Sequence, residues 1–220
     1  MTRFRVGDEV FGIARGSFAE YALARENKLA HKPAGLSYEQ AAAMPISGLT
    51  ALRALDTAGV TAGQTVLVVG ASGGVGTYAV QLAVAAGATV AGVASTRKLR
   101  LVHDLGATEV IDYTQEDFAD GSRVFDVILD IGGVTPIQRL RRALSRTGTL
   151  AIIGGENGAT WSPGMGRQLH ATLLNPFLSQ RLVMVTNKEH HSGLERLAAF
   201  AIDGSVASFI RPPLPAARYS

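Results

Sequence analysis

Short apolar runs alternate with longer helical segments through most of the chain. The first run, residues 66–69, is followed by a predicted helix over residues 76–86. Further strands are predicted at residues 89–94, 109–112, 124–129, 150–153 and 182–185, and further helices at residues 98–105, 135–144, 167–178 and 192–204. Strands that alternate with helices in this way indicate a doubly wound parallel sheet with both faces covered. The predicted fold class is therefore α/β.

The two ends of the chain have a different pattern. Residues 6–12 and 17–23 are predicted to be short strands. Ser37 and Gln40 have the spacing of a capping box, so a helix is expected over residues 40–43, and a second helix is expected over residues 47–58. Residues 206–214 return to β character. We therefore expect three parts: a β part (1–42), an α/β domain (43–204) and a return segment (205–220).

The composition narrows the function classes. Of 220 residues, 47% are hydrophobic and 18% are charged, which is enough for a large core and excludes global disorder. The chain has no cysteine, which excludes a disulfide scaffold, a thiolate zinc site and a cysteine nucleophile. The 21 Lys and Arg residues exceed the 18 Asp and Glu residues only slightly and form no long block, so nucleic acid is not the expected partner.

The sequence carries no pattern for export or membrane insertion. Residues 1–11 are charged and alternating, unlike a signal or transit peptide, so a cytoplasmic protein is expected. Residues 57–96 contain no charged side chain, but glycines interrupt them repeatedly. No apolar run approaches the ~20 residues of a spanning helix, so no membrane association is expected.

A glycine-rich turn follows the first apolar strand directly and leads into a helix. Its sequence is Ala71-Ser72-Gly73-Gly74-Val75-Gly76. Gly73 allows the backbone to approach a pyrophosphate, Gly76 allows the helix to pack closely on the strand, and the helix amides hold the phosphate charge. Ala71 replaces the first glycine of the dinucleotide fingerprint, but Gly70 precedes it and can relax the same turn. Such turns also occur without a ligand, and that alternative stays open.

The end of the second strand of the α/β domain decides between the two nicotinamide dinucleotides. An NAD site places an acid there for the ribose 2′-hydroxyl, whereas this chain has Ser95-Thr96-Arg97-Lys98 and no acid from residue 89 to 98. Cationic side chains pair with a 2′-phosphate, so NADPH is the expected cofactor. Alternatively, Arg97, Lys98 and Arg100 are simply the solvated start of a helix.

Several other classes are disfavoured by their missing motifs. No tyrosine is followed four positions later by lysine, which excludes the short-chain dehydrogenase pair, and the P-loop motif is absent. His190 and His191 are adjacent and lack the spacing of metal ligands, so no metal site is expected. The arginines between residues 139 and 146 could touch RNA, but a solvated helix face explains them better because no aromatic residue interleaves them.

The chain resembles the medium-chain dehydrogenase/reductase superfamily, specifically its zinc-free quinone oxidoreductase (zeta-crystallin-like) branch. The matching motifs are Gly7-Asp8-Glu9-Val10-Phe11-Gly12, Gly16-Ser17-Phe18-Ala19-Glu20-Tyr21, Ala41-Ala42-Ala43-Met44-Pro45, Gly48-Leu49-Thr50-Ala51, Gly70 to Gly76, Val110-Ile111-Asp112-Tyr113 and Phe125-Asp126-Val127-Ile128-Leu129-Asp130. The resemblance implies a Rossmann NADP-binding domain (43–204), remnants of a GroES-like β domain (1–42) and an incomplete return to it (205–220). It also implies that the chain is truncated at both ends.

The resemblance implies cofactor contacts at specific positions. They are Thr50 near the nicotinamide, Gly73, Gly74, Val75 and Gly76 on the pyrophosphate, Ser95, Lys98 and Tyr113 around the 2′-phosphate, and Ile131, Gly154 and Gly155 at the ribose and nicotinamide. Thr50 could instead bond its own helix backbone, and Tyr113 could be an ordinary strand-end aromatic. No catalytic residue is assigned.

The function implied by the resemblance is NADPH-dependent hydride transfer to a quinone or an α,β-unsaturated carbonyl without zinc. The expected assembly is a homodimer through the sheet edge near residues 182–185. The alternative is an inactive or truncated NADP-binding module that lacks a complete substrate pocket.

Overall fold

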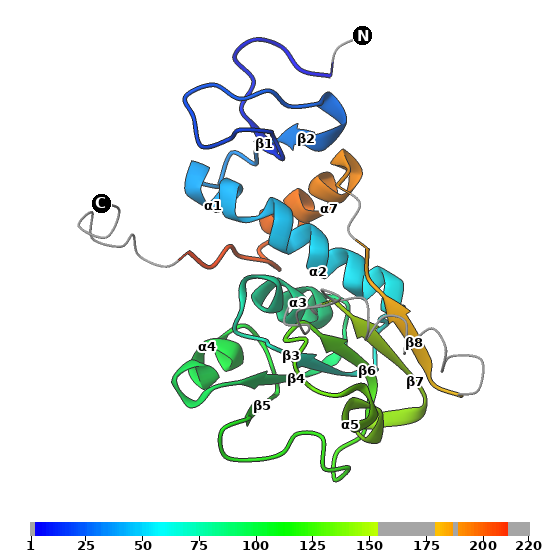
Figure 1. Ribbon diagram of the computed structural model, residues 1–220. Coiled ribbons are helices and arrows are strands. Elements are labelled where there is room, and N and C mark those ends of the chain that lie inside the picture. Colours follow the sequence, from blue (N-terminus) through cyan, green and yellow to red (C-terminus); the bar gives the residue numbers. More distant parts are fainter. Residues whose placement is uncertain (1–2, 154–178, 187–188, 211–220) are drawn as a thin grey trace.

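A six-stranded parallel sheet forms the centre of the computed structural model, which describes residues 3–153, 179–186 and 189–210 (Figure 1). The strands lie in the order β5-β4-β3-β6-β7-β8, and each neighbouring pair is parallel. Their bounds are β3 (Thr65–Val69), β4 (Thr89–Ala94), β5 (Glu109–Asp112), β6 (Phe125–Asp130), β7 (Leu144–Ile152) and β8 (Arg181–Met184). The order confirms the doubly wound α/β fold.

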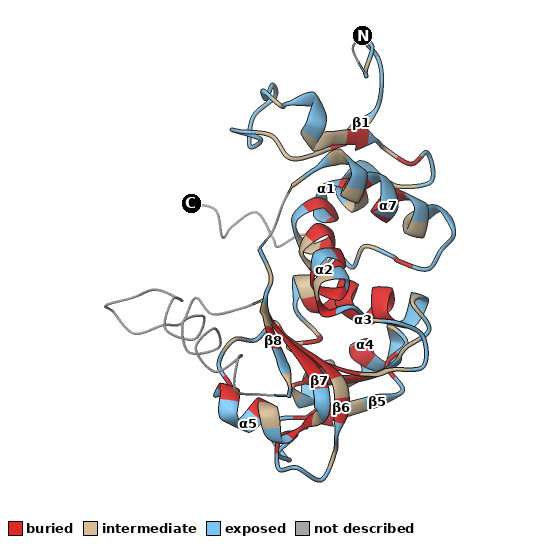
Figure 2. Ribbon diagram, turned by 90° about the vertical axis from the view of Figure 1, so that its right-hand side faces the viewer, coloured by how far each residue is buried: buried red, intermediate tan, exposed pale blue. Residues whose placement is uncertain are grey.

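Helices cover both faces of this sheet (Figures 1 and 2). One face carries α2 (Pro45–Ala58), α3 (Gly74–Ala85) and α4 (Leu99–Asp104), and the other carries α5 (Ile137–Arg142). The last helix, α7 (His191–Ile202), packs on α2 and on residues 29–31 and not directly on the sheet. Alternate residues of β3 reach the two cores: Val66 and Val68 enter one, and Leu67 and Val69 enter the other. A strand buried on both faces needs a continuous apolar run, which is why residues 66–69 predict it so clearly.

The N-terminal part forms a small separate sheet above the helices in Figure 1. Strands β1 (Val10–Gly12) and β2 (Leu29–His31) pair antiparallel, followed by the short helix α1 (Tyr38–Ala43). The prediction of a strand over residues 17–23 is wrong, because only an isolated bridge joins Arg15 to Leu23. Phe18 and Tyr21 are almost fully exposed, so the alternating pattern has no surface to pack against. The division at residues 42 and 204 stays a prediction.

The starts of α1 and α2 follow local rules. The hydroxyl of Ser37 accepts from the Gln40 amide, and the Gln40 side chain accepts from the Ser37 amide, which confirms the capping box. Pro45 does not interrupt the second helix but begins it, two residues before the predicted start, because proline is well suited to a first turn where its missing N–H is not needed. Gly59 ends α2 at a φ of 73°.

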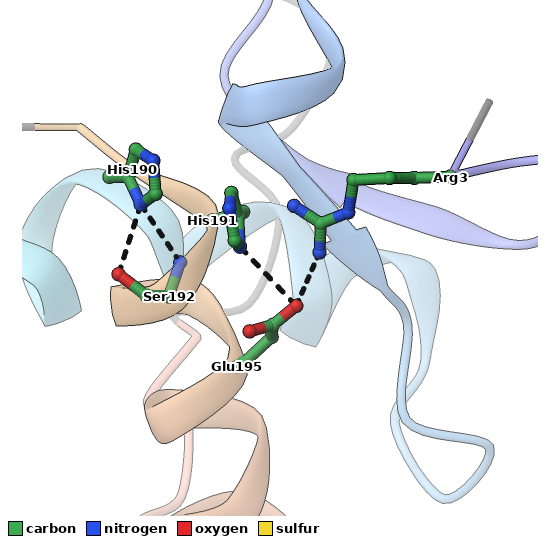
Figure 3. A network of polar contacts seen from close by, with 5 residues as sticks. All are labelled: Arg3, His190, His191, Ser192 and Glu195. Carbon is green, nitrogen blue, oxygen red and sulfur yellow. Dashed lines mark hydrogen bonds and ion pairs between the residues drawn. The ribbon is translucent and has the colours of Figure 1, made fainter. Parts of the chain in front are cut away.

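The start of α7 differs from its prediction (Figure 3). The helix begins at His191, one residue before the predicted start, and its N-cap is His190, whose ring nitrogen accepts from the Ser192 amide. Glu195 pairs with Arg3, and its Oε1 lies 3.4 Å from Nδ1 of His191. This network joins the first described residues to α7, although they are far apart in sequence.

Other boundaries also shift. α5 begins at Ile137, inside the predicted range of residues 135–144, with Pro136 as its N-cap. α4 agrees with the helix predicted over residues 98–105, and a short 3-10 helix, η2 (Thr96–Lys98), precedes it. Residues 206–210 form no strand, because the side-chain amide of Gln81 takes both backbone bonds of Ala207. The predicted helix over residues 167–178 and residues 211–214 lie outside the described residues.

Replacing Gly92 by alanine should destabilise the fold. Gly92 lies in β4 under α4, and a Cβ there would sit 2.3 Å from Cγ1 of the buried Val102. Overpacking of this kind costs about 1–3 kcal/mol, which urea denaturation would measure. Gly35→Ala is the matched control, because a Cβ there meets no atom within 4 Å. Equal stability of the two variants would contradict the packing of α4 on β4.

Candidate functional site

A cavity of about 670 Å³ opens at the carboxyl ends of the central strands. Val69 and Gly70 line it from the end of β3, Ser95 from the end of β4, Tyr113 from the end of β5 and Gly132 from beyond β6. The sheet grows from β3 through β4 to β5 on one side and from β6 to β8 on the other. The cavity therefore lies at the switch point, where doubly wound sheets bind their ligands.

The glycine turn after β3 brings α3 unusually close to the strand. Gly70 has a φ of 87°, and its carbonyl accepts from the Gly73 amide. A Cβ on Gly76 would fall 2.1 Å from that same carbonyl oxygen and 2.7 Å from the carbonyl carbon of Ala71. The structure therefore requires glycine at position 76, and it tolerates Ala71 because Gly70 supplies the positive φ.

The N-terminus of α3 points its free amides toward the strand ends. Its N-cap, Gly73, makes no side-chain cap, and Gly73 and Gly74 are exposed. Within the described residues, no acceptor is found for the amides of Gly74, Val75 and Gly76. A Cβ on Gly73 would approach only the Gly70 oxygen, at 3.4 Å, so the space in front of the turn is open. Free amides, a helix dipole and open space fit a pyrophosphate.

The basic turn after β4 begins at the cavity: Ser95 lines it, and Arg97 and Lys98 follow outside the lining. Ser95 is half-buried, Arg97 is exposed, and Lys98 is half-buried. Among the ion pairs of the described residues, neither Arg97 nor Lys98 has a carboxylate partner, whereas Arg100 lies 3.6 Å from Asp104. The two cations at positions 97 and 98 are thus available to an anion that reaches the end of β4.

Asp112 at the end of β5 is a residue of this site that the sequence reasoning missed. Its Oδ2 accepts from the hydroxyl of Thr96 at 2.5 Å, and its Oδ1 accepts from the amide and hydroxyl of Thr114. The Thr96 hydroxyl above all, together with the Thr114 donors, holds the pKa of Asp112 below its ordinary value despite burial. An acid at the carboxyl end of the third strand of the domain, opposite Ser95-Thr96, was the signal that could have found it.

The remaining predicted contacts are placed differently. The hydroxyl of Thr50 donates to the carbonyl of Ile46 one turn earlier in α2, as its alternative explanation proposes. Ile131 is half-buried, and its amide and that of Gly132 both donate to the Val69 carbonyl, which ties the ends of β3 and β6 together. Gly154 and Gly155 lie outside the described residues. Ser95 and Tyr113 are the predicted contacts found in the cavity lining within the described part of the chain.

The described residues contain no group of three or more His, Cys, Asp or Glu side chains that could hold a metal ion. None of the helices in residues 3–153, 179–186 and 189–210 is both long and apolar enough to cross a membrane.

Comparisons with known proteins agree with this geometry. A family model described as "Zinc-binding dehydrogenase" matches residues 74–182. The 2-methylene-furan-3-one reductase of Solanum lycopersicum is 34% identical over 221 residues, which cover 95% of this chain and 51% of that protein. The solved quinone oxidoreductase of Coxiella burnetii superposes with a TM-score of 0.78 and 31% identity over 92% of this chain and 63% of that one. The solved structure of the Escherichia coli quinone oxidoreductase complexed with NADPH superposes with a TM-score of 0.68 and 28% sequence identity. The superposition covers 84% of this chain and 59% of that one.

The chain belongs to the medium-chain dehydrogenase/reductase superfamily, in its quinone oxidoreductase branch. The resemblance to this superfamily and to its quinone oxidoreductase branch is thereby confirmed. The chain spans about half the length of the curated relatives it matches. The superfamily's Rossmann domain accounts for the six-stranded sheet and for the cavity at its carboxyl edge.

The stability of the protein in acid should depend on Asp112. Because its pKa in the folded state is below the ordinary 3.8, the unfolded chain takes up a proton first as the pH falls. The carboxylate of Asp112 therefore stabilises the fold fully above its pKa in the unfolded chain. This contribution is lost as the pH falls through its pKa in the folded protein. Urea denaturation between about pH 5 and pH 2 should show a smaller decline for Asp112→Asn than for the wild type.

Glu20→Gln is the control, because Glu20 is an exposed carboxylate that makes no hydrogen bond or ion pair within the described residues. An identical pH dependence of Asp112→Asn and the wild type would contradict the network around Asp112.

Proposed function

We propose that this protein is an NADPH-dependent oxidoreductase that transfers hydride to a quinone or an α,β-unsaturated carbonyl without zinc. The observation that carries the proposal is the pair of cations, Arg97 and Lys98, that follows β4 without a carboxylate partner among the described ion pairs. The names of the relatives support the reaction class: an enone reductase, a quinone oxidoreductase and a quinone oxidoreductase bound to NADPH.

Different residues of the site would bind different parts of the cofactor. The amides of Gly74, Val75 and Gly76 would hold the pyrophosphate, and Ser95, Arg97 and Lys98 would surround the 2′-phosphate beside Tyr113. Thr50 and Ile131 are assigned to the nicotinamide half from the family resemblance. When bound, NADPH supplies the hydride. The contribution of the chain is to orient the cofactor and to exclude the competing dinucleotide by charge.

Zinc is left out of the proposed reaction because the chain contains no cysteine thiolate to bind it. Polarisation of the substrate carbonyl would then come from hydrogen bonds, and the proton from water or a hydroxyl group. No residue is assigned to that proton transfer.

A binding module without turnover is the second candidate. It is favoured by one observation, that the cavity of the described residues lies where a dinucleotide binds, whereas no residue is assigned to proton transfer to a substrate. A module of this kind would keep the dinucleotide site and lack a complete substrate pocket.

The remaining expectations stay predictions. β8 pairs only with β7 in the described part of the chain, so its other edge is open for the proposed homodimer. The cytoplasmic location and the absence of nucleic-acid or membrane partners also stay predictions.

The oxidoreductase proposal predicts that the protein consumes NADPH in the presence of benzoquinone or a simple enone. Loss of NADPH absorbance measures the turnover, and a titration of NADPH without substrate measures binding. Turnover would support the reductase, and binding without turnover would support the module. Absence of both would contradict the dinucleotide site itself.

Reversing the charge of Lys98 should separate the two cofactors. Lys98→Glu places a carboxylate beside the 2′-phosphate, so the Kd for NADPH should rise by about tenfold or more while the Kd for NADH changes little. Arg53→Glu is the matched control, because Arg53 is an exposed residue of α2 that does not line the cavity. Equal losses for NADPH and NADH would contradict the assignment of the 2′-phosphate to this turn.

A further inference from the structure

Asp112 is a buried carboxylate between two segments that line the cavity. The pairing of β4 with β5 sets Ala94 beside Asp112, and the chains continue from there into Ser95 and Tyr113. Asp112 is 7% exposed, so its charge lies under the cavity wall and not in the cavity lining. A carboxylate in this place must be satisfied by nearby donors.

Donors from both strand ends satisfy it. The Thr96 hydroxyl, which follows β4, donates to Oδ2 at 2.5 Å. The Thr114 amide and hydroxyl, which follow β5, donate to Oδ1 at 2.9 Å and 2.7 Å. The two threonine hydroxyls also lie 3.2 Å apart. Asp112 therefore bridges the ends of two neighbouring strands through both of its oxygens.

The same carboxylate anchors the turn that carries the two cations. Thr96 is the first residue of η2, and Arg97 and Lys98 are the next two. The side chain of Ser95, the N-cap of η2, makes no capping hydrogen bond. The Lys98 amide donates to the Ser95 carbonyl, but this bond lies within the turn and does not attach it to a neighbouring segment. Within the described residues, the side-chain bonds that hold η2 to the neighbouring segment are those of Thr96 with Asp112 and Thr114.

The role of this acid differs from that of the acid in an NAD site. An NAD site presents its carboxylate at the end of the second strand, to the ribose hydroxyls. Asp112 stands at the end of the third strand of the domain, and its oxygens are taken by hydroxyl and amide donors. Asp112 binds threonines and not Arg97 or Lys98. Both cationic side chains are therefore without an ion-pair partner among the described residues and can pair with an anion.

We propose that Asp112 is a positioning residue for cofactor selectivity, which holds Thr96 and thereby sets Arg97 and Lys98 at the 2′-phosphate of NADPH. This inference rests on the proposed function. Its consequence is that loss of the carboxylate lowers the affinity for NADPH and leaves the affinity for NADH, which has no 2′-phosphate, nearly unchanged.

The test compares the Kd values of NADPH and NADH, measured by calorimetry on the full chain, for the wild type and its variants. Asp112→Ala should weaken NADPH about tenfold, as expected for lost hydrogen bonds to a charged group, with NADH changing less than about twofold. Asp112→Asn should restore the selectivity, because the amide oxygen still accepts from Thr114 and the amide nitrogen can donate to Thr96. Thr96→Val should act as Asp112→Ala does.

Asp120→Ala is the matched control. Asp120 also accepts from a nearby amide, that of Ser122, but it is exposed and does not line the cavity. This variant should leave both Kd values unchanged.

The outcomes separate this inference from the proposed function. If the wild type prefers NADPH but Asp112→Ala loses both cofactors equally, or neither, Asp112 is only structural and the inference is overturned. If Asp112→Ala does not fold, Thr96→Val decides in the same way, because position 96 is exposed and valine keeps the shape of threonine. If the wild type binds no dinucleotide or prefers NADH, the proposed function fails first.

Discussion

The close contact between the start of α3 and the turn after β3 is the constraint on which the rest of the site depends. A Cβ at position 76 would overlap the Gly70 carbonyl at 2.1 Å, so the helix can lie this close to the strand only with glycine there. The approach places the free amides of α3 at the carboxyl end of β3, beside the switch point between the neighbouring strands β3 and β6. An anion can therefore be bound by the backbone, with no charged side chain in the turn.

A second positive region begins at the same cavity, and its geometry depends on an acid. Arg97 and Lys98 provide charge for an anion because they have no ion-pair partners among the described residues. Asp112 would be expected to neutralise such charges, but its oxygens are taken by Thr96 and Thr114. The carboxylate thus fixes the turn through Thr96 and forms no ion pair with Arg97 or Lys98. A dinucleotide with charge at both its pyrophosphate and its ribose matches these two regions.

The sequence predicted the structure correctly where a strand is buried on both faces and where the deciding contact lies within a few residues. Residues 66–69 are apolar throughout because both sheet faces are covered, and the capping box at Ser37 depends only on residues three apart. It failed where the deciding contact is distant. The alternating residues 17–23 have the pattern of a strand but no partner surface in the fold. Asp112 was missed because its role depends on the register that sets β5 beside β4, although its place at the end of a predicted strand was visible in the sequence.

Crystals of the protein grown with NADPH would show directly where the cofactor binds. We expect the pyrophosphate within hydrogen-bond distance of the amides of Gly74, Val75 and Gly76, and the 2′-phosphate against Ser95 and Lys98. A dinucleotide bound elsewhere, or bound here with its 2′-phosphate turned away from the end of β4, would contradict this expectation.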